Sequence, residues 1–195
     1  MARALGEMSV HELGTLFPII VSAYDPAWPA RYTAEAALIT EAHGPGTVVR
    51  LSHIGSTAVP GLLAKPTIDI LLEVADDVDE ERLVRSFAAI GYVHDLQPER
   101  PAPHLMFMKG YTPDGFSGQA FHVHVRFRGD WDEFYFRDYL ADHPAEAERY
   151  AALKRRLQER HEFDREAYTE GKTAFVRAVT MRARADLGVE NGRYR

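Results

Sequence analysis

Residues 53–73 read HIGSTAVPGLLAKPTIDILLE, and this stretch decides the fold. The run 48–54 that leads into it is rich in β-branched and apolar residues, which predicts a strand. Gly55 ends that strand, because glycine accepts positive φ and lets the backbone approach a ligand closely. Ser56 and Thr57 are placed to cap a short helical turn, whose free N–H groups attract anions. The stretch therefore predicts a strand followed by an anion-binding turn.

A second strand, residues 67–74, carries a lone aspartate. Strand alternation separates an apolar face from a face that carries Asp69, Leu71 and Glu73. A carboxylate inside a strand costs several kcal/mol unless it is solvated, paired or metal-bound. We therefore expect Asp69 to face an open cleft. The alternative is that Gly55 marks an ordinary turn and that Asp69 pairs with an arginine or a lysine.

The pattern HIGSTAVPGL-x-AKP-x-IDI in residues 53–70 resembles the signature of the GrpB family, a branch of the nucleotidyltransferase-like superfamily. The resemblance covers most of residues 17–185. It implies an α+β fold, with a nucleotidyltransferase-like mixed β-sheet, flanking helices and a C-terminal helical extension. We expect a lead over residues 1–16, a core over 17–129 and helices over 130–195 that pack on the core as a single domain.

The resemblance also implies roles for individual residues. In active members of the superfamily the Gly-Ser turn holds nucleotide phosphates, and strand carboxylates hold one or two Mg²⁺ ions. Carried over, the phosphates of ATP or another NTP would lie on Gly55, Ser56 and Thr57, and Asp69 would hold Mg²⁺ or Mn²⁺. The second carboxylate position of that pattern holds Leu71 here. This departure argues against two-metal chemistry, because two ions about 4 Å apart need several bridging carboxylates.

Three basic residues are candidates for neutralising phosphate charge. Lys65 belongs to the signature, and Arg126 lies on a later strand. Lys172 falls on the apolar stripe of the last predicted helix, where a lysine is unusual. Either its stem carries the ammonium out to solvent, or the ammonium reaches the cleft, which its match to the family's Tyr-x-x-x-Lys pattern favours. We predict that Lys65 and Lys172 act with Asp69 in catalysis.

Residues 121–128 show the clearest alternation in the chain. Two histidines spaced by two on a strand point the same way, about 7 Å apart, which suits metal binding or phosphate contact. The alternative is the polar outer face of an antiparallel sheet. We predict a metal set of Asp69, His122 and His124, with Glu73 as a further candidate. The polar face of this strand comprises His122, His124, Arg126 and Arg128.

Three helix details complete the prediction. Asp25 is expected to cap a helix that has Pro26 as its first residue and ends near Ala42. Asp130 is expected to cap the first of the C-terminal helices. In the next of these helices Lys154 is expected to point outward.

Composition limits the classes of function. The chain has 195 residues, 46% of them hydrophobic, and no cysteine. These values indicate a folded domain in a reducing compartment and exclude thiol chemistry and cysteine-bound zinc. No signal-like run and no stretch of membrane-span length is visible, so we expect a cytoplasmic protein that does not bind membranes. The net charge of −6 argues against duplex nucleic acid as a partner.

Three functions fit these observations. The first is NTP- and metal-dependent nucleotidyl transfer, or adenylate-forming ligation, to a small-molecule or protein acceptor. The second is a metal-dependent hydrolase or lyase centred on Asp69, His122 and His124. The third is a non-catalytic binding or folding accessory module that keeps the fold, which the loss of the second carboxylate at Leu71 would suit.

Overall fold

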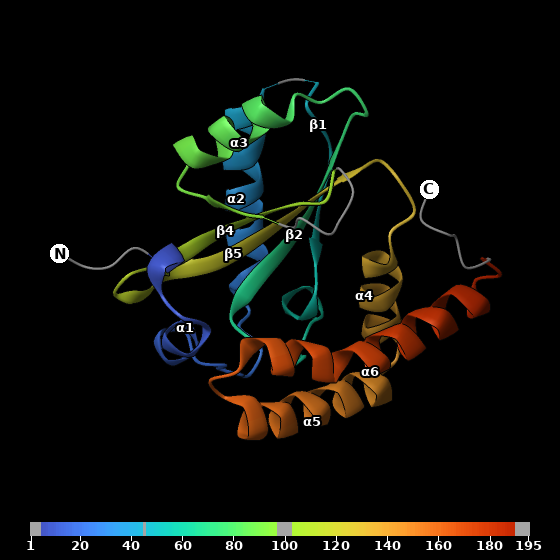
Figure 1. Ribbon diagram of the computed structural model, residues 1–195. Coiled ribbons are helices and arrows are strands. Elements are labelled where there is room, and N and C mark those ends of the chain that lie inside the picture. Colours follow the sequence, from blue (N-terminus) through green and yellow to red (C-terminus); the bar gives the residue numbers. More distant parts are fainter. Residues whose placement is uncertain (1–4, 45, 97–102, 190–195) are drawn as a thin grey trace.

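A computed structural model describes residues 5–44, 46–96 and 103–189, so parts of the predicted lead and C-terminal segment lie outside the described residues. Its centre is a five-stranded mixed sheet in the order β1-β2-β5-β4-β3 (Figure 1). The strands are β1 (Val48–Ile54), β2 (Thr67–Val74), β3 (Val93–Asp95), β4 (Leu105–Thr112) and β5 (Gly115–Phe127). The pair β2 and β5 is parallel, and the other pairs are antiparallel. The predicted mixed α+β sheet is confirmed.

Six helices surround this sheet in the described ranges. They are α1 (Val10–Leu16), α2 (Trp28–His43), α3 (Glu80–Ala89), α4 (Asp132–Asp142), α5 (Pro144–His161) and α6 (Arg165–Asp186). Two 3-10 turns, η1 (Leu5–Glu7) and η2 (Ser56–Ala58), complete the described elements. None of these helices in the described ranges combines the length and the apolar character that a bilayer crossing needs.

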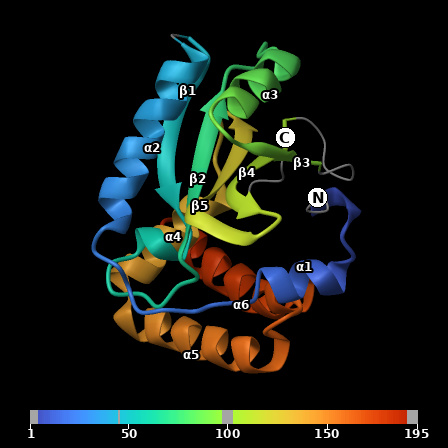
Figure 2. The same cartoon turned by 90° about the vertical axis from the view of Figure 1, so that its left-hand side faces the viewer.

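Helices α2 and α3 cover one face of the sheet (Figure 2). The apolar side chains of β2, including Ile68 and Ile70, are fully buried there and pack with Trp28 of α2 and Phe87 of α3. Each such side chain contributes about 1.5–3 kcal/mol when fully buried. Because Ile68 and Ile70 face these helices, strand alternation turns Asp69 to the opposite face of the sheet.

Helices α4, α5 and α6 gather near one end of the sheet (Figures 1 and 2). They form a second apolar cluster with the segment between η2 and β2, through contacts of Val59 and Leu62 with Phe136, Tyr150 and Val179. The cluster brings α5 and α6 up to the turn that follows β1.

The segment between α1 and α2, here called the N-terminal arm, is extended. It makes an isolated antiparallel bridge between Ser22 and Ala64, with N–H···O distances of 2.9 and 3.0 Å. Farther back, the amide of Ile19 donates to the carbonyl oxygen of Glu162 at 2.7 Å, just before α6. The arm therefore ties the loop before β2 to the corner between α5 and α6.

Two cap predictions are wrong. Helix α2 begins at Trp28 with Ala27 as its N-cap, because Asp25 instead closes a turn before the helix by accepting the Ala27 amide at 2.9 Å. The N-cap of α4 is Trp131, not Asp130. The Asp130 carboxylate lies 2.7 Å from a guanidinium nitrogen of the buried Arg184, and this charge contact takes the place of the cap.

Candidate functional site

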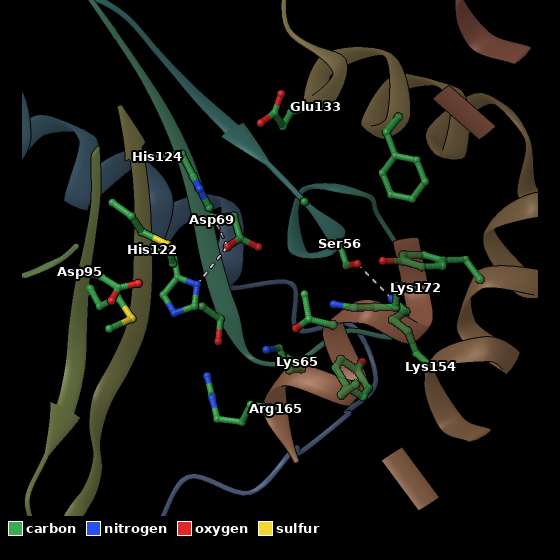
Figure 3. Close-up of a pocket in the computed structure, with 18 of the residues that line it drawn as sticks. Ser56, Lys65, Asp69, Asp95, His122, His124, Glu133, Lys154, Arg165 and Lys172 are labelled. Atoms are coloured by element: carbon green, nitrogen blue, oxygen red, sulfur yellow. Dashed lines mark hydrogen bonds and ion pairs between the residues drawn. The ribbon is translucent and has the colours of Figure 1, made fainter. Parts of the chain in front are cut away.

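A cavity of about 570 Å³ lies between the polar face of the sheet and helices α4 to α6 (Figure 3). Asp69 lines it, so the predicted cleft in front of this aspartate is present. Most of the predicted site residues line the same cavity, namely Gly55, Ser56, Lys65, Asp69, His122, His124, Arg126 and Lys172.

Gly55 allows the backbone of the turn after β1 to lie close to the side chain of Asp69. Its φ of 70° and ψ of −169° fit the prediction of positive φ. A Cβ atom at this position would lie only 2.5 Å from Asp69 Oδ2. Glycine is therefore needed twice here, for the backbone conformation and for the close approach.

The side chain of Thr57 does not line the cavity, in contrast to its predicted place on a nucleotide. Its hydroxyl is buried, donates to the carbonyl oxygen of Thr67 at 3.2 Å and lies 3.0 Å from His53 Nε2. The expected side-chain cap is also wrong, since Ser56 and Thr57 lie inside η2 with Gly55 as N-cap. Ser56 remains the hydroxyl of this turn that faces the cavity.

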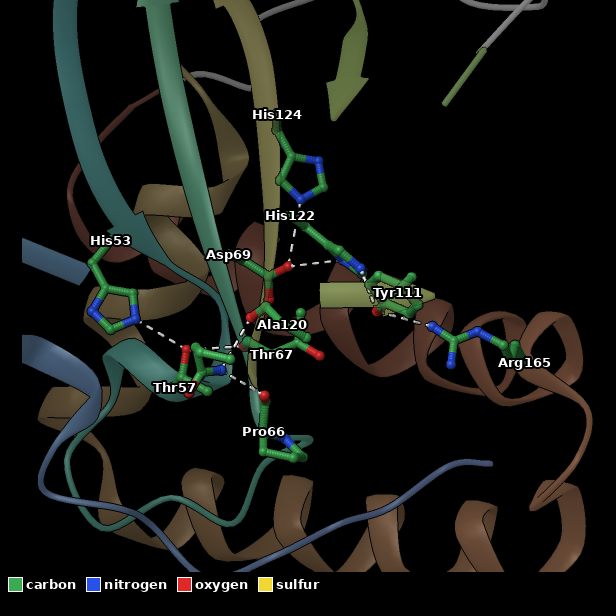
Figure 4. Close-up of polar contacts among 11 residues, drawn as sticks. His53, Thr57, Pro66, Thr67, Asp69, Tyr111, Ala120, His122, His124 and Arg165 are labelled. Atoms are coloured by element: carbon green, nitrogen blue, oxygen red, sulfur yellow. Dashed lines mark hydrogen bonds and ion pairs between the residues drawn. The ribbon is translucent and has the colours of Figure 1, made fainter. Parts of the chain in front are cut away.

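Asp69, His122 and His124 form a compact group, here called the Asp–His–His cluster (Figure 4). Asp69 on β2 is the register partner of His122 on the parallel strand β5, and His124 follows on the same face. Asp69 Oδ1 lies 3.4 Å from His122 Nδ1 and 3.5 Å from His124 Nε2. One potential ligand atom from each residue falls within 4.8 Å of the others. The predicted metal set is thus brought together, although its two strands are far apart in sequence.

The protonation states suit ion binding. Burial alone would raise the pKa of Asp69, but hydrogen bonds from His122 and His124 outweigh it and hold that pKa well below its ordinary value. Burial lowers the pKa of His122, against the opposing effect of Asp69. Near neutral pH the cluster therefore offers an ionised carboxylate and a neutral His122 ring.

Behind the cluster lies a second layer of polar groups that sequence reasoning missed. Tyr111 OH on β4 lies 2.8 Å from His122 Nε2, and Arg165 Nη2 lies 3.4 Å from the same hydroxyl (Figure 4). Burial raises the pKa of Tyr111 and keeps it a neutral phenol. The long hairpin of β4 and β5 brings Tyr111 beside the histidine.

Lys65, Lys154 and Lys172, here called the lysine wall, line the side of the cavity near α5 and α6 (Figure 3). The prediction that Lys154 points outward is wrong. Lys154 is only 2% exposed, and its ammonium nitrogen donates to Ser56 Oγ at 3.0 Å and to the carbonyl oxygen of Leu63. Its position four residues after Tyr150, on the buried stripe of α5, was the signal that could have found it.

The lysine wall concentrates positive charge on one side of the cavity. Within the described residues none of its members pairs with a carboxylate, and the wall faces Arg165. Burial, with the neighbouring positive charges, lowers the pKa of both Lys65 and Lys154 to about 7. Burial also lowers the pKa of Lys172. An anion bound beside the wall would favour the charged form of each lysine and raise these pKa values.

Tyr168 adds a buried hydroxyl to the same wall. Its ring lies under Lys65 and Lys172, at 5.6 and 4.6 Å from the two nitrogens. The residue is 1% exposed, and its hydroxyl has no hydrogen-bond partner among the described groups. Buried hydroxyls are normally satisfied, so this unpartnered one is an exception among the residues that line the cavity.

Glu73 is not available as a metal ligand, which corrects its place among the candidates. It is fully buried, pairs with Arg50 and accepts the amide of Gly129 at 3.0 Å. Leu71 is also fully buried. Arg126 lines the cavity beyond His124, whereas Arg128 does not.

The fold is that of the nucleotidyltransferase-fold proteins. A crystal structure of Cid1 poly(U) polymerase with Mg and 3′-dATP bound is similar in fold, with a TM-score of 0.50 at 11% identity over 83% of this chain and 51% of that chain. The family model described as "GrpB protein" matches residues 18–182, so the chain belongs to the GrpB family.

Two relatives support this assignment. The crystal structure of the conserved protein GrpB from Enterococcus faecalis is similar with a TM-score of 0.74 at 29% identity, covering 87% of this chain and 99% of that chain. The UPF0157 protein PA4798 of Pseudomonas aeruginosa is 44% identical over 164 residues, which is 83% of this chain and 66% of the relative's own length. The resemblance seen in residues 53–70 is confirmed.

Proposed function

We propose that the cavity binds an NTP together with a divalent metal ion, for nucleotidyl transfer or adenylate-forming ligation to a small-molecule or protein acceptor. One observation carries the proposal. The Asp–His–His cluster and the lysine wall open into the same cavity, on either side of Ser56.

The lysine wall supports a polyphosphate ligand. Burying ammonium groups without counter-ions is costly, and the cost is offset when a multiply charged anion enters. Lys154 already holds Ser56 Oγ at 3.0 Å, so one phosphate could contact the ammonium and the hydroxyl together.

The Asp–His–His cluster supports the metal. Asp69 and the two histidines would hold the ion, which supplies charge neutralisation at the phosphates when bound. The residues of the chain would act by positioning and electrostatics: Ser56 and Lys154 orient the phosphates, and the lysine wall stabilises the charge of the departing pyrophosphate.

Titration calorimetry tests the proposal with ATP and UTP in the presence of Mn²⁺. We expect one nucleotide to bind per chain, and binding to weaken strongly without metal. In Asp69→Asn the metal-dependent part of the binding is lost. Asp114→Asn, at the exposed turn between β4 and β5, is the matched control and binds as wild type does. Absence of binding to the wild type, with every nucleotide and with metal present, contradicts the proposal.

Binding of inorganic pyrophosphate should depend on pH. The pKa of Lys154 is lowered to about 7 by burial, Lys172 and Arg155, and an anion would raise it again. Affinity therefore falls as pH rises above 7, and at pH 8 binding takes up protons from the buffer. Calorimetry in buffers of different ionisation enthalpy measures this uptake, which should decrease in Lys154→Met. An uptake of zero in the wild type would show that Lys154 does not face the anion.

A metal-dependent hydrolase or lyase is the second candidate. The donor set favours it, because two histidines and one carboxylate form the cluster while Leu71 occupies the place of a second carboxylate. Turnover of a substrate with metal alone, and no heat with any nucleotide, would favour this function over nucleotidyl transfer.

A further inference from the structure

The donor atoms of the Asp–His–His cluster indicate which kind of ion it suits. The cluster offers one carboxylate oxygen, from Asp69, and two imidazole nitrogens, from His122 and His124. Among residues 5–44, 46–96 and 103–189 it is the sole group of three or more histidine and acidic side chains within ligand reach of one another. An ion at this place would therefore have nitrogen as the majority of its protein ligands.

Mg²⁺ fits such a set poorly. It is bound through oxygen ligands, usually one or two carboxylates, phosphates and retained waters. Imidazole suits first-row transition ions, and two histidines with one carboxylate leave open positions for water or a substrate oxygen. The next two positions on the same face of β2 add no second carboxylate for Mg²⁺, since Leu71 is apolar and Glu73 is held by Arg50 and Gly129.

The groups behind His122 support its use as a ligand. Metal-binding histidines usually donate their second ring N–H to an oxygen, which fixes the tautomer and the ring orientation. Tyr111 OH stands 2.8 Å from His122 Nε2, and Arg165 approaches the hydroxyl from the far side (Figure 4). Without metal, His122 Nδ1 donates to Asp69 Oδ1 at 3.4 Å. With an ion bound, the proton would lie on Nε2 and be donated to Tyr111, which frees the Nδ1 lone pair for the ion.

We propose that Asp69, His122 and His124 bind a first-row transition ion such as Mn²⁺, Co²⁺ or Zn²⁺ in preference to Mg²⁺, with Tyr111 as the positioning residue of His122. The inference concerns the metal of the proposed NTP site and rests on that site being a metal centre. It requires no nucleotide, so metal binding without NTP binding would overturn the proposed function and leave this inference intact.

The test uses the untagged, metal-free, 195-residue chain titrated with Co²⁺ and, separately, with Mg²⁺. We expect one Co²⁺ per chain with visible ligand-field bands, and no heat from Mg²⁺ at the same concentrations. His122→Ala and His124→Ala should each lose the bands. Tyr111→Phe should keep a shifted band and bind roughly 10- to 100-fold more weakly, as expected for loss of a hydrogen bond to a ligand.

Two controls separate a lost ligand from a lost fold. His104→Ala removes another histidine of the same cavity that is outside the cluster, and it should bind Co²⁺ as the wild type does. Pulsed electron paramagnetic resonance of the wild type with Mn²⁺ should show couplings to imidazole nitrogen. Mg²⁺ affinity equal to that for Co²⁺, or no nitrogen coupling in the Mn²⁺ spectrum, overturns the inference.

Discussion

Gly55→Ala is expected to lower the stability of the protein and to remove its metal affinity at the same time. With φ of 70° and ψ of −169°, Gly55 occupies a region that is nearly restricted to glycine, where another residue costs about 1–3 kcal/mol. The new Cβ atom would also meet Asp69 Oδ2 at 2.5 Å. The carboxylate must move, and the contacts that join it to His122 and His124 are then lost.

Gly44→Ala is a matched control for this effect. Gly44 has nearly the same backbone conformation, with φ of 72° and ψ of 177°, but an alanine Cβ atom there would have nothing within 4 Å. Both variants should lose a similar free energy of unfolding in urea, and only Gly55→Ala should lose Co²⁺ binding. Full metal affinity in Gly55→Ala would show that Asp69 is not held by this contact.

Lys154→Met should stabilise the protein near pH 7 while weakening its binding of pyrophosphate. Burial lowers the pKa of Lys154 from 10.5 to about 7, so folding disfavours the charged form. By linkage, this destabilisation is fully present below pH 7 and disappears as pH rises through 10.5, and it amounts to about 5 kcal/mol. Loss of the contacts to Ser56 and Leu63 offsets part of the gain, which leaves a net stabilisation on the order of 2 kcal/mol.

Urea unfolding at several pH values measures this gain. Wild-type stability should rise with pH between 7 and 10 relative to Lys154→Met, whose stability lacks this contribution. Arg156→Met, two positions along α5 and exposed, is the matched control and should change stability by less than about 0.5 kcal/mol. A loss of stability in Lys154→Met at pH 7 would mean that Lys154 serves folding more than ligand binding.

Much of the site follows from local sequence rules. Strand alternation is enough to turn Asp69 toward a cleft, and the same rule puts His122 and His124 on one face of β5. The need for positive φ at Gly55 follows from the strand that stops there. That the two strands lie side by side and parallel is seen only in the structure, because alternation does not choose strand neighbours.

The missed residues depend on tertiary contacts. Lys154 is charged and was therefore expected outside, although Tyr150 and Leu157 place it on the buried stripe of α5. Arg165 lies in the site only because the start of α6 comes close to β4, where its guanidinium contacts Tyr111 OH. Thr57 shows the opposite error: it was predicted to contact the nucleotide, but its hydroxyl donates to the carbonyl oxygen of Thr67 beneath the turn.

The parallel pairing of β2 with β5 has a consequence for how the chain reaches its native state. Asp69 and His122 become neighbours only when these strands join, and α3, β3 and β4 all lie between them in sequence. Contacts of such long range form slowly, because a large loop must close before they are made. A partly folded chain in which β5 has not yet paired with β2 does not bring the three ligands together. The rate of transition-ion binding during refolding would therefore report the rate at which β5 pairs with β2.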